Sequence, residues 1–311
     1  MKVFLILLCC LCFWPDASAA TLHLIAVADT QNASLGKACR SNLERIDKQL
    51  ALVEKYTALS INKVYITGSE VITDSIIAIA QRLNCSKQDV VLFHYSGHGI
   101  NRGSTWPDFL IPGRASLSLG KVRELLQTKS PRLLIALADA CNGKSRHPTA
   151  SRGEASLAYR PRVANDIIQA NYQRLFCEAE GSIVACSSQV GSSSYYSPYL
   201  GGYFTLSLME SMVYETKESR EANWLDVLQA AKEMTSQTAQ SYGKQQIPVF
   251  AMYPGECAPM PYKTYIVQKH DTLFQIAKTH ETTALRLKEW NALEADLIRV
   301  GDVLKIYTKQ P

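Results

Sequence analysis

The chain has 311 residues, of which 47% are hydrophobic and 20% charged, a composition typical of a globular protein rather than a disordered one. Its formal net charge of +5 is modest and spread along the chain, with no basic stripe interleaved with aromatic residues, so nucleic-acid binding has no support. This length favours one large core and a smaller second module.

The first twenty residues have the layout of a cleaved secretory signal. Lys2 precedes a twelve-residue apolar stretch, 3–14, which is followed by Pro15 and the small residues 17–19. The apolar stretch is shorter than the roughly 20 residues that span a bilayer, so a membrane anchor is the weaker interpretation. We therefore expect residues 1–20 to be a signal peptide, and the mature chain to be secreted or periplasmic without a stable membrane anchor.

Short apolar runs alternate with helical patterns from residue 21 to about 253. Six runs are predicted to be strands: 22–28, 63–66, 90–95, 133–138, 182–186 and 249–253. Hydrophobic residues recur at helical spacing between them, with Thr73 as a candidate N-cap and with Asn223 and Asp226 opening a further helix. Apolar strands joined by helices predict an α/β fold with a mostly parallel sheet buried on both faces. Ligands bind such sheets beyond the carboxyl ends of the strands.

Two segments interrupt the alternation. Residues 142–170 are rich in Gly and Ser and carry five Lys or Arg residues, which predicts a long exposed loop. Prolines at 254, 259 and 261 then separate the sheet domain from a tail of about fifty residues. Three cysteines fall within the signal, which leaves six of the nine in the mature chain, at wide and irregular spacings that do not define a disulfide pattern.

The sequence FHYSGHG, residues 93–99, places His98 between two glycines just after a predicted strand. A metal ligand, a packed core histidine and a catalytic base all fit such a position. His94 and His98 would share one face of a helix, but a strand leading into a glycine turn splays them apart, and no third ligand motif stands nearby. We therefore expect no metal at this pair, and we interpret His94 as a packed strand residue.

Cys141 follows the strand 133–138 as His98 follows the strand 90–95. If these strands are neighbours about 4.8 Å apart, both residues lie at one edge of the sheet. An imidazole beside a cysteine can take up the thiol proton and later protonate a leaving amine. The N–H groups of Gly99 and Cys141 could stabilise a developing oxyanion, at about 3 kcal/mol per donor.

At these motifs the chain resembles the caspase-like cysteine peptidases of clan CD, in particular the bacterial metacaspase relatives called orthocaspases. YSGHG at 95–99 matches the histidine motif, and Asp139-Ala140-Cys141 matches the cysteine motif. The similarity continues through 181–189, 201–212 and the segment QQIPVF, and so covers residues 21–255. The resemblance implies a caspase-like fold and a cofactor-free peptidase with His98 as the base and Cys141 as the nucleophile.

The resemblance also implies a pocket for the substrate residue before the cleaved bond, formed by Asp139, Ser96, Cys39 and Asn42. Metacaspase relatives have an aspartate where this chain has Asn42. A carboxylate at Asp139 still favours Arg or Lys in the substrate, because a basic side chain buried there needs a paired charge. The family resemblance further suggests self-cleavage in the basic loop after Cys141. Many metacaspases depend on calcium, but this sequence has no loop of closely spaced acidic residues, so that dependence does not carry over.

The tail, residues 262–309, resembles a LysM module with a strand, two helices and a final strand. Its landmarks are the Asp-Thr-Leu turn, the pair Trp290-Asn291 and the segment LIRVGDVLKI. His270 and Val300 depart from the glycine and proline usual in the family. The resemblance implies binding to N-acetylglucosamine-containing glycans such as peptidoglycan, through two loops that comprise Asp271, Thr272, Leu273, Leu297, Ile298 and Arg299.

The sequence therefore predicts a signal peptide (1–20), a caspase-like peptidase domain (21–255), a linker (256–261) and a LysM domain (262–309). The predicted protein is a secreted cysteine endopeptidase that cleaves after Arg or Lys and is held at peptidoglycan. Two alternatives stay open: a catalytically silent scaffold that binds peptidoglycan, and a peptidoglycan-cleaving enzyme.

Overall fold

A computed structural model describes most of the chain. The described residues are 20–113, 116–144, 149–150, 165–219, 221–253, 262–280, 282, 284–291, 293 and 295–307. The predicted signal up to residue 19, most of the basic loop and the linker 256–261 lie outside them. Within the described ranges, no helix is both long and apolar enough to cross a membrane.

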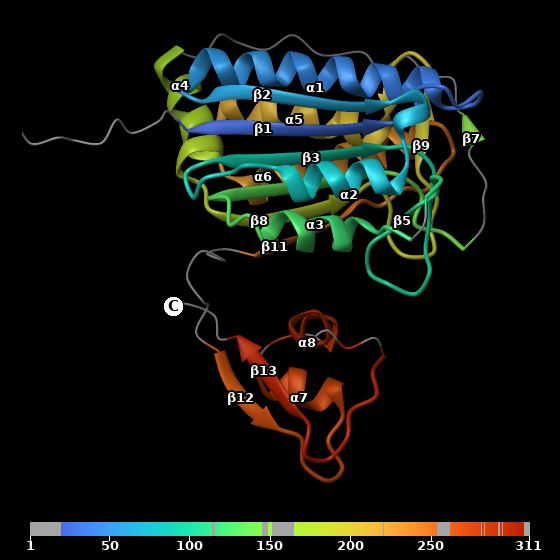
Figure 1. The fold of residues 1–311 in the computed structure, drawn as a ribbon, viewed down its shortest axis with the longest axis vertical. Helices are drawn as coiled ribbons and strands as arrows, with labels where there is room; N and C mark the ends of the chain where they lie inside the picture. Colours follow the sequence, from blue (N-terminus) through green and yellow to red (C-terminus); the bar gives the residue numbers. More distant parts are fainter. Residues whose placement is uncertain are drawn as a thin grey trace, which may run out of the picture.

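Six strands form the central sheet, in the order β11-β8-β6-β3-β1-β2 (Figure 1). The first five along the chain run parallel, and only β11 pairs antiparallel, with β8. All six predicted strands are confirmed within a few residues at each end. Their bounds are β1 (Thr21–Ala28), β2 (Ser60–Thr67), β3 (Val90–Ser96), β6 (Leu133–Asp139), β8 (Gly181–Cys186) and β11 (Val249–Tyr253).

Helices cover both faces of this sheet (Figure 1). One face carries α1 (Gly36–Tyr56), α4 (Asn165–Gln173), α5 (Tyr203–Glu218) and α6 (Trp224–Ser241). The other carries α2 (Thr73–Arg82) and α3 (Leu119–Gln127). Each face has its own apolar cluster, so β3 and β6 are buried along their whole length. A buried sheet of this kind fixes the loops that leave its edge.

Short elements complete the domain. Those around the carboxyl edge of the sheet are η1 (Gly68–Glu70), β4 (Gly99–Ile100), β5 (Asp108–Phe109), β7 (Thr149–Ala150), β9 (Tyr195–Ser197) and β10 (Gly201–Gly202), whereas η2 (Arg174–Glu178) directly precedes β8 at the opposite edge. The strand β4 pairs with β5, and β9 lies between β10 and β7. The loops after β3, β6 and β8 are therefore held by small sheets of their own.

The ends of three helices test the sequence predictions. Asn223 caps α6 as predicted, since its Oδ1 accepts from the Asp226 N–H at 3.0 Å. Thr73 does not cap α2: Ile72 is the N-cap, and the Thr73 N–H donates to the Pro112 carbonyl at 2.8 Å. The prediction of a loop over 142–170 is wrong for its last residues, because α4 begins at Asn165 and buries Ile168 in the core.

The C-terminal module has the predicted order of strand, two helices and strand. Its elements are β12 (Tyr262–Ile266), α7 (Leu273–Thr279), α8 (Ala284–Asn291) and β13 (Val303–Tyr307), with β12 and β13 antiparallel. A small core holds Leu273, Ile276 and Ala277 from α7 together with Leu287 and strand residues. These three α7 side chains thus face the interior of the module. The side chains of Leu285 and Trp290 lie outside the described part of the chain.

Candidate active site

The loops that carry His98 and Cys141 leave neighbouring strands at the same edge of the sheet. β3 pairs with β6 in parallel, with Ser96 opposite Asp139. Beyond the strands the loops stay joined, because the Gly97 N–H donates to the Asp139 carbonyl at 3.3 Å and the Asn101 N–H to the Gly143 carbonyl at 2.9 Å. The expected convergence of these two loops therefore follows from the strand order.

The backbone of His98 is fixed from two sides. Its carbonyl accepts from the Tyr95 hydroxyl at 2.7 Å and from the Leu110 N–H at 2.9 Å. Tyr95 is fully buried and its ring stacks on Phe109 with 3.8 Å between the ring centroids. In an antiparallel pair of strands, only every second residue is hydrogen-bonded to the partner strand. Because the His98 carbonyl bonds to Leu110, the next residue, Gly99, directs its N–H away from β5.

Gly99 lets the histidine loop pack directly on the cysteine loop. A Cβ at this position would lie 2.4 Å from the Cys141 carbonyl oxygen and 2.9 Å from the Ala140 Cβ. Both contacts are shorter than real Cβ atoms tolerate, and neither atom belongs to a flexible side chain. A glycine at 99 is therefore required for the two candidate catalytic residues to come together.

The thiol of Cys141 faces the backbone of Ser194. The Ser194 N–H donates to Sγ at 3.2 Å, and Sγ lies 3.8 Å from the Ser194 carbonyl oxygen. Burial raises the pKa of the Cys141 thiol above its usual value, the Ser194 N–H acts in the opposite direction, and the nearby Asp139 adds to the increase. The resting cysteine is thus a neutral thiol, so a nucleophilic role requires a base that removes its proton.

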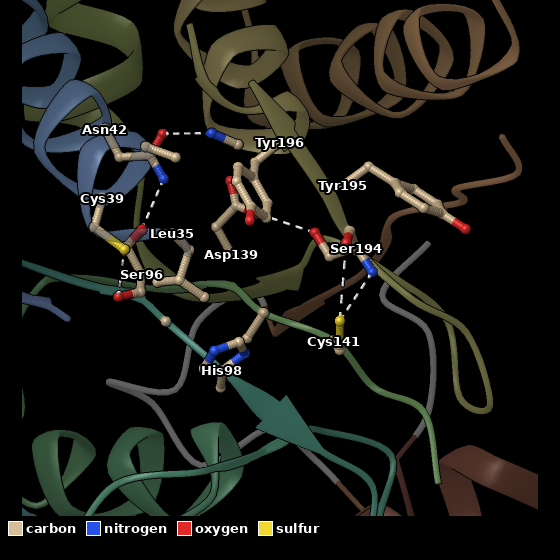
Figure 2. Close-up of a pocket in the computed structure, with 14 residues that line it drawn as sticks. Leu35, Cys39, Asn42, Ser96, His98, Asp139, Cys141, Ser194, Tyr195 and Tyr196 are labelled. Atoms are coloured by element: carbon tan, nitrogen blue, oxygen red, sulfur yellow. Dashed lines mark hydrogen bonds between the residues drawn. The ribbon is translucent and has the colours of Figure 1, made fainter. Parts of the chain in front are cut away.

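One pocket holds both candidate catalytic residues and all four residues predicted to bind the substrate side chain (Figure 2). His98 and Cys141 reach it from the loops after β3 and β6, and Asp139 from the end of β6. The sequence analysis missed several other lining residues: Leu35, Ala38, Ser194, Tyr195, Tyr196 and Gly202. These come from the start of α1 and from the segment around β9 and β10.

Asp139 is a carboxylate almost removed from solvent and surrounded by donors. Oδ1 accepts from the Ser194 hydroxyl at 3.1 Å, while Oδ2 accepts from the Thr205 N–H at 3.0 Å and the Thr205 hydroxyl at 2.7 Å. Burial raises the pKa of Asp139 above its usual range, although these hydrogen bonds counteract the increase. Gly202 lies against it, since a Cβ there would stand 2.0 Å from Oδ2.

His94 supports this carboxylate from inside the core. Its Nε2 lies 3.0 Å from the Thr205 hydroxyl, whose own proton points to Asp139. Complete burial lowers the pKa of His94 to about 3, so the ring is neutral and Nε2 carries the donated proton. The other ring nitrogen, Nδ1, is buried and has no hydrogen-bond partner among the residues that the structure describes. His94 is thus a packed strand residue, as expected, that also orients Thr205.

The remaining predicted pocket residues form a hydrogen-bonded wall on the α1 side (Figure 2). Asn42 donates to the Ser96 hydroxyl at 2.8 Å and accepts from the Gly202 N–H at 2.8 Å. The Asn42 side chain uses its amide N–H for the first bond and its amide oxygen for the second. Asn42, which stands where the family resemblance implies an aspartate, thus has a structural role. Cys39 donates to the Ser96 carbonyl at 3.3 Å, and burial raises the pKa of its thiol to about 12.

Gln246 is a further residue that the sequence analysis passed over. It is 1% exposed, accepts from the Tyr195 N–H at 2.9 Å and donates to the Ser187 carbonyl at 3.0 Å. It also lies 3.3 Å from the Ser194 hydroxyl. Gln246 therefore fixes the segment whose backbone contacts the Cys141 thiol. It belongs to the QQIPVF segment, which the family resemblance had marked without assigning a role.

The first predicted glycan-binding loop is shaped by its own hydrogen bonds. Asp271 accepts from the Gln268 N–H and the Tyr265 hydroxyl, both at 2.7 Å, and Thr272 caps α7. The Leu273 side chain is buried, so only its backbone can face a ligand. His270 has a φ of +75°, a conformation that glycine adopts without strain.

The second predicted loop presents its side chains to solvent. Leu297 is 72% exposed and Arg299 is exposed, whereas Ile298 packs partly against the module core. The Arg299 N–H donates to the Asp302 carboxylate at 2.8 Å, which holds the turn before Gly301. Phe274, 72% exposed at the start of α7, is an aromatic side chain that the sequence analysis did not consider.

Comparisons with known proteins identify both parts of the chain. The sequence model of the caspase domain family matches residues 39–253, and that of the LysM domain matches residues 265–306. No curated protein matches the chain. Among solved structures, caspase-1 from Spodoptera frugiperda matches with 16% identity and a TM-score of 0.48, over 75% of this chain and 85% of that one. The chain belongs to the caspase domain family and carries a C-terminal LysM domain.

Proposed function

We propose that this protein is a cysteine endopeptidase in which Cys141 attacks the peptide carbonyl and His98 accepts its proton. The observation that carries the proposal is the joining of their two loops: Gly99 packs on the Cys141 backbone, and His98 and Cys141 line one pocket. Because burial raises the pKa of the thiol, the attack requires a base that takes up the thiol proton, and we assign this role to His98.

The reaction would proceed through an acyl-enzyme. Sγ of Cys141 bonds to the carbonyl carbon, and the carbonyl oxygen, now negative, accepts from the N–H groups of Gly99 and Cys141. His98 then protonates the amine as the C–N bond breaks. A water molecule, deprotonated by His98, hydrolyses the thioester and restores the thiol.

We propose Arg or Lys as the substrate residue before the cleaved bond. Asp139 lies in the pocket that also holds Cys141, with its Oδ1 bonded to the Ser194 hydroxyl and its Oδ2 bonded twice to Thr205. A guanidinium or ammonium group at Oδ1 would pair the buried carboxylate and stabilise its charged form. Ser96 and Asn42 would shape the opposite wall.

We further propose that the LysM domain holds the enzyme at peptidoglycan, with 21–255 as the catalytic domain, 256–261 as the linker and 262–309 as the binding module. Asp271, Thr272 and the Leu273 backbone would form one side of the glycan site, and Leu297, Ile298 and Arg299 the other. The signal-like first twenty residues and the LysM domain support our further proposal that the protein acts in the periplasm or outside the cell.

Hydrolysis of fluorogenic peptides with Arg, Lys, Asp or Asn before the cleaved bond tests the proposal. We expect cleavage after Arg and Lys, and at least a 1,000-fold loss of kcat/KM in Cys141→Ala and His98→Ala. Cleavage after Asp would contradict the assignment of Asp139. If no peptide is cleaved while the chain still sediments with purified peptidoglycan, the protein is a silent scaffold. Release of soluble peptidoglycan fragments would instead indicate a wall hydrolase.

A further inference from the structure

Three side chains with metal-binding atoms converge at the end of the sheet opposite to His98 and Cys141. His23 lies near the start of β1, Asp89 directly precedes β3, and Cys85 lies in the loop between α2 and β3. One atom from each, an imidazole nitrogen, the thiol sulfur and a carboxylate oxygen, lies within 4.8 Å of the other two. In the part of the chain that the structure describes, no other three His, Cys, Asp or Glu side chains meet this criterion.

The cluster is separate from the pocket of the proposed peptidase. His23 is in register with Val91, whereas Ala28 at the other end of β1 is in register with Ser96 of the pocket. Five residues along a strand span about 17 Å at roughly 3.3 Å each. A ligand at the cluster would therefore not touch the candidate catalytic residues.

We propose that His23, Cys85 and Asp89 bind a zinc-like divalent cation. A set of one nitrogen, one sulfur and one oxygen donor suits zinc, whereas calcium and magnesium select oxygen alone. Ligand atoms around a tetrahedral zinc ion stand roughly 3.3–3.8 Å apart. The His23 Nε2 and Asp89 Oδ2 are already 3.3 Å apart, so binding requires the Cys85 sulfur to move by at most roughly 1.5 Å.

The two buried ligands are held in place before any ion binds. Asp89 is 7% exposed, and its oxygens accept from the Thr21 N–H at 2.8 Å and the Ser86 N–H at 2.7 Å. His23 is 8% exposed, and its Nδ1 lies 3.4 Å from the Asn62 side-chain amide. With that amide turned so that its oxygen accepts from Nδ1–H, Asn62 becomes the outer partner that orients a metal-bound histidine.

A simpler explanation of this cluster is an ion pair between His23 and Asp89, in which Cys85 takes no part. Cys85 distinguishes the two explanations. Its Sγ, only partly buried, has a weak contact at 3.4 Å with the Ser86 carbonyl, so it can turn toward the cluster without losing a strong hydrogen bond. Burial and the nearby Asp89 raise the pKa of the Cys85 thiol to about 12, and Lys129 acts in the opposite direction, so a bound ion would have to displace the thiol proton.

A bound ion would connect the start of β1 to the loop before β3. Three protein ligands leave the fourth tetrahedral position to water, so the site would be compact but accessible. An ion that binds only the folded chain raises its stability by mass action. At 100 times the dissociation constant, we expect the melting temperature to rise by roughly 5–10 °C for a domain of this size.

Titration of the Cys141→Ala chain with Co²⁺ and Zn²⁺ tests the site, because this background lacks the thiol of the proposed active site. We expect one equivalent of Co²⁺ to bind with a thiolate-to-cobalt charge-transfer band and a tetrahedral d–d spectrum. Cys85→Ser should abolish the charge-transfer band and weaken Zn²⁺ binding at least tenfold. Cys177→Ser, which changes another partly buried cysteine, should leave both unchanged. None of these readouts depends on peptidase activity.

His23→Gln provides a second variant in case Cys85→Ser impairs folding, and circular dichroism establishes that each variant is folded. We expect His23→Gln to weaken Zn²⁺ binding at least tenfold and to remove most of the zinc-induced rise in melting temperature. The proposal is overturned if the parent chain shows no charge-transfer band, if that band survives Cys85→Ser, or if Zn²⁺ leaves the melting temperature unchanged.

Discussion

Replacing Thr205 with valine keeps the shape of the side chain but removes a hydroxyl from a buried chain of three polar groups. That hydroxyl accepts from His94 Nε2 at 3.0 Å and donates to Asp139 Oδ2 at 2.7 Å. In the valine variant, the Asp139 carboxylate loses a hydrogen bond worth about 1.5–3 kcal/mol. The buried N–H of the His94 imidazole loses its acceptor, which costs about 1–3 kcal/mol more. We expect the free energy of unfolding to fall by roughly 2.5–6 kcal/mol.

The same change should alter the pH dependence of the peptidase. The Thr205 bonds lower the pKa of Asp139 against the effect of burial, so removing the hydroxyl raises that pKa further. A protonated Asp139 cannot pair with a basic substrate residue. We therefore expect the acidic limb of kcat/KM for an Arg peptide to move to higher pH, with a loss of up to about 10- to 150-fold below that limb.

Two control variants separate an effect on the substrate pocket from a general loss of stability. Thr205→Ser keeps the hydroxyl and should retain the wild-type pH profile. The double variant His94→Leu with Thr205→Val removes both neutral partners, so it should recover stability while keeping the shifted profile. Stopped-flow or plate-based hydrolysis from pH 5 to 8, with urea unfolding alongside, measures both quantities. If Thr205→Val has the profile of Thr205→Ser, Asp139 does not bind the substrate residue as proposed.

Three further predictions follow from the site and the LysM domain. In the wild type, burial raises the pKa of Asp139, so kcat/KM for an Arg peptide should rise between acidic and neutral pH while that of a neutral peptide changes less. Gly202→Ala puts a Cβ 2.0 Å from the Asp139 carboxylate, so it should cost about 1–3 kcal/mol of stability and raise KM for Arg peptides. His270→Gly relieves a positive φ and should stabilise the LysM domain by about 1 kcal/mol in calorimetry.

Each of these has a clear contrary result. Parallel pH profiles for Arg and neutral peptides would show that ionisation of Asp139 does not govern binding. An unchanged KM in Gly202→Ala would mean that the wall formed by Gly202 does not shape the substrate pocket. A destabilised His270→Gly chain would mean that the His270 side chain contributes more than its backbone conformation costs.

The fold was predictable because its strands are continuous apolar runs. The four strands β1, β3, β6 and β8 are buried throughout almost their entire length, and burial on both faces is what such runs predict. The edge of the sheet that carries the loops of His98 and Cys141 followed from the same pattern. Local signals were less reliable: Asn223 caps its helix, but Thr73, an equally suitable residue type, begins inside its helix.

The support of the site could not be predicted in the same way. Ser194, Thr205 and Gln246 act through bonds to residues more than fifty positions away, and nothing in their local sequence specifies those partners. His23 and Asp89 likewise meet only because β1 and β3 are neighbours. Motifs predicted the candidate reacting groups, whereas the packing of the segments from β8 to α5 and from α6 to β11 determines the groups that surround them.

The proposed nucleophile can be tested by covalent labelling. A peptide chloromethyl ketone with Arg at its reactive end should modify one residue, and peptide mass spectrometry should place the label on Cys141. We expect His98→Ala to slow labelling by at least 100-fold, and we expect the thiols of Cys39, Cys85, Cys177 and Cys186 to stay unmodified in the folded chain. Labelling of another cysteine, or equal labelling of wild type and His98→Ala, would contradict the account.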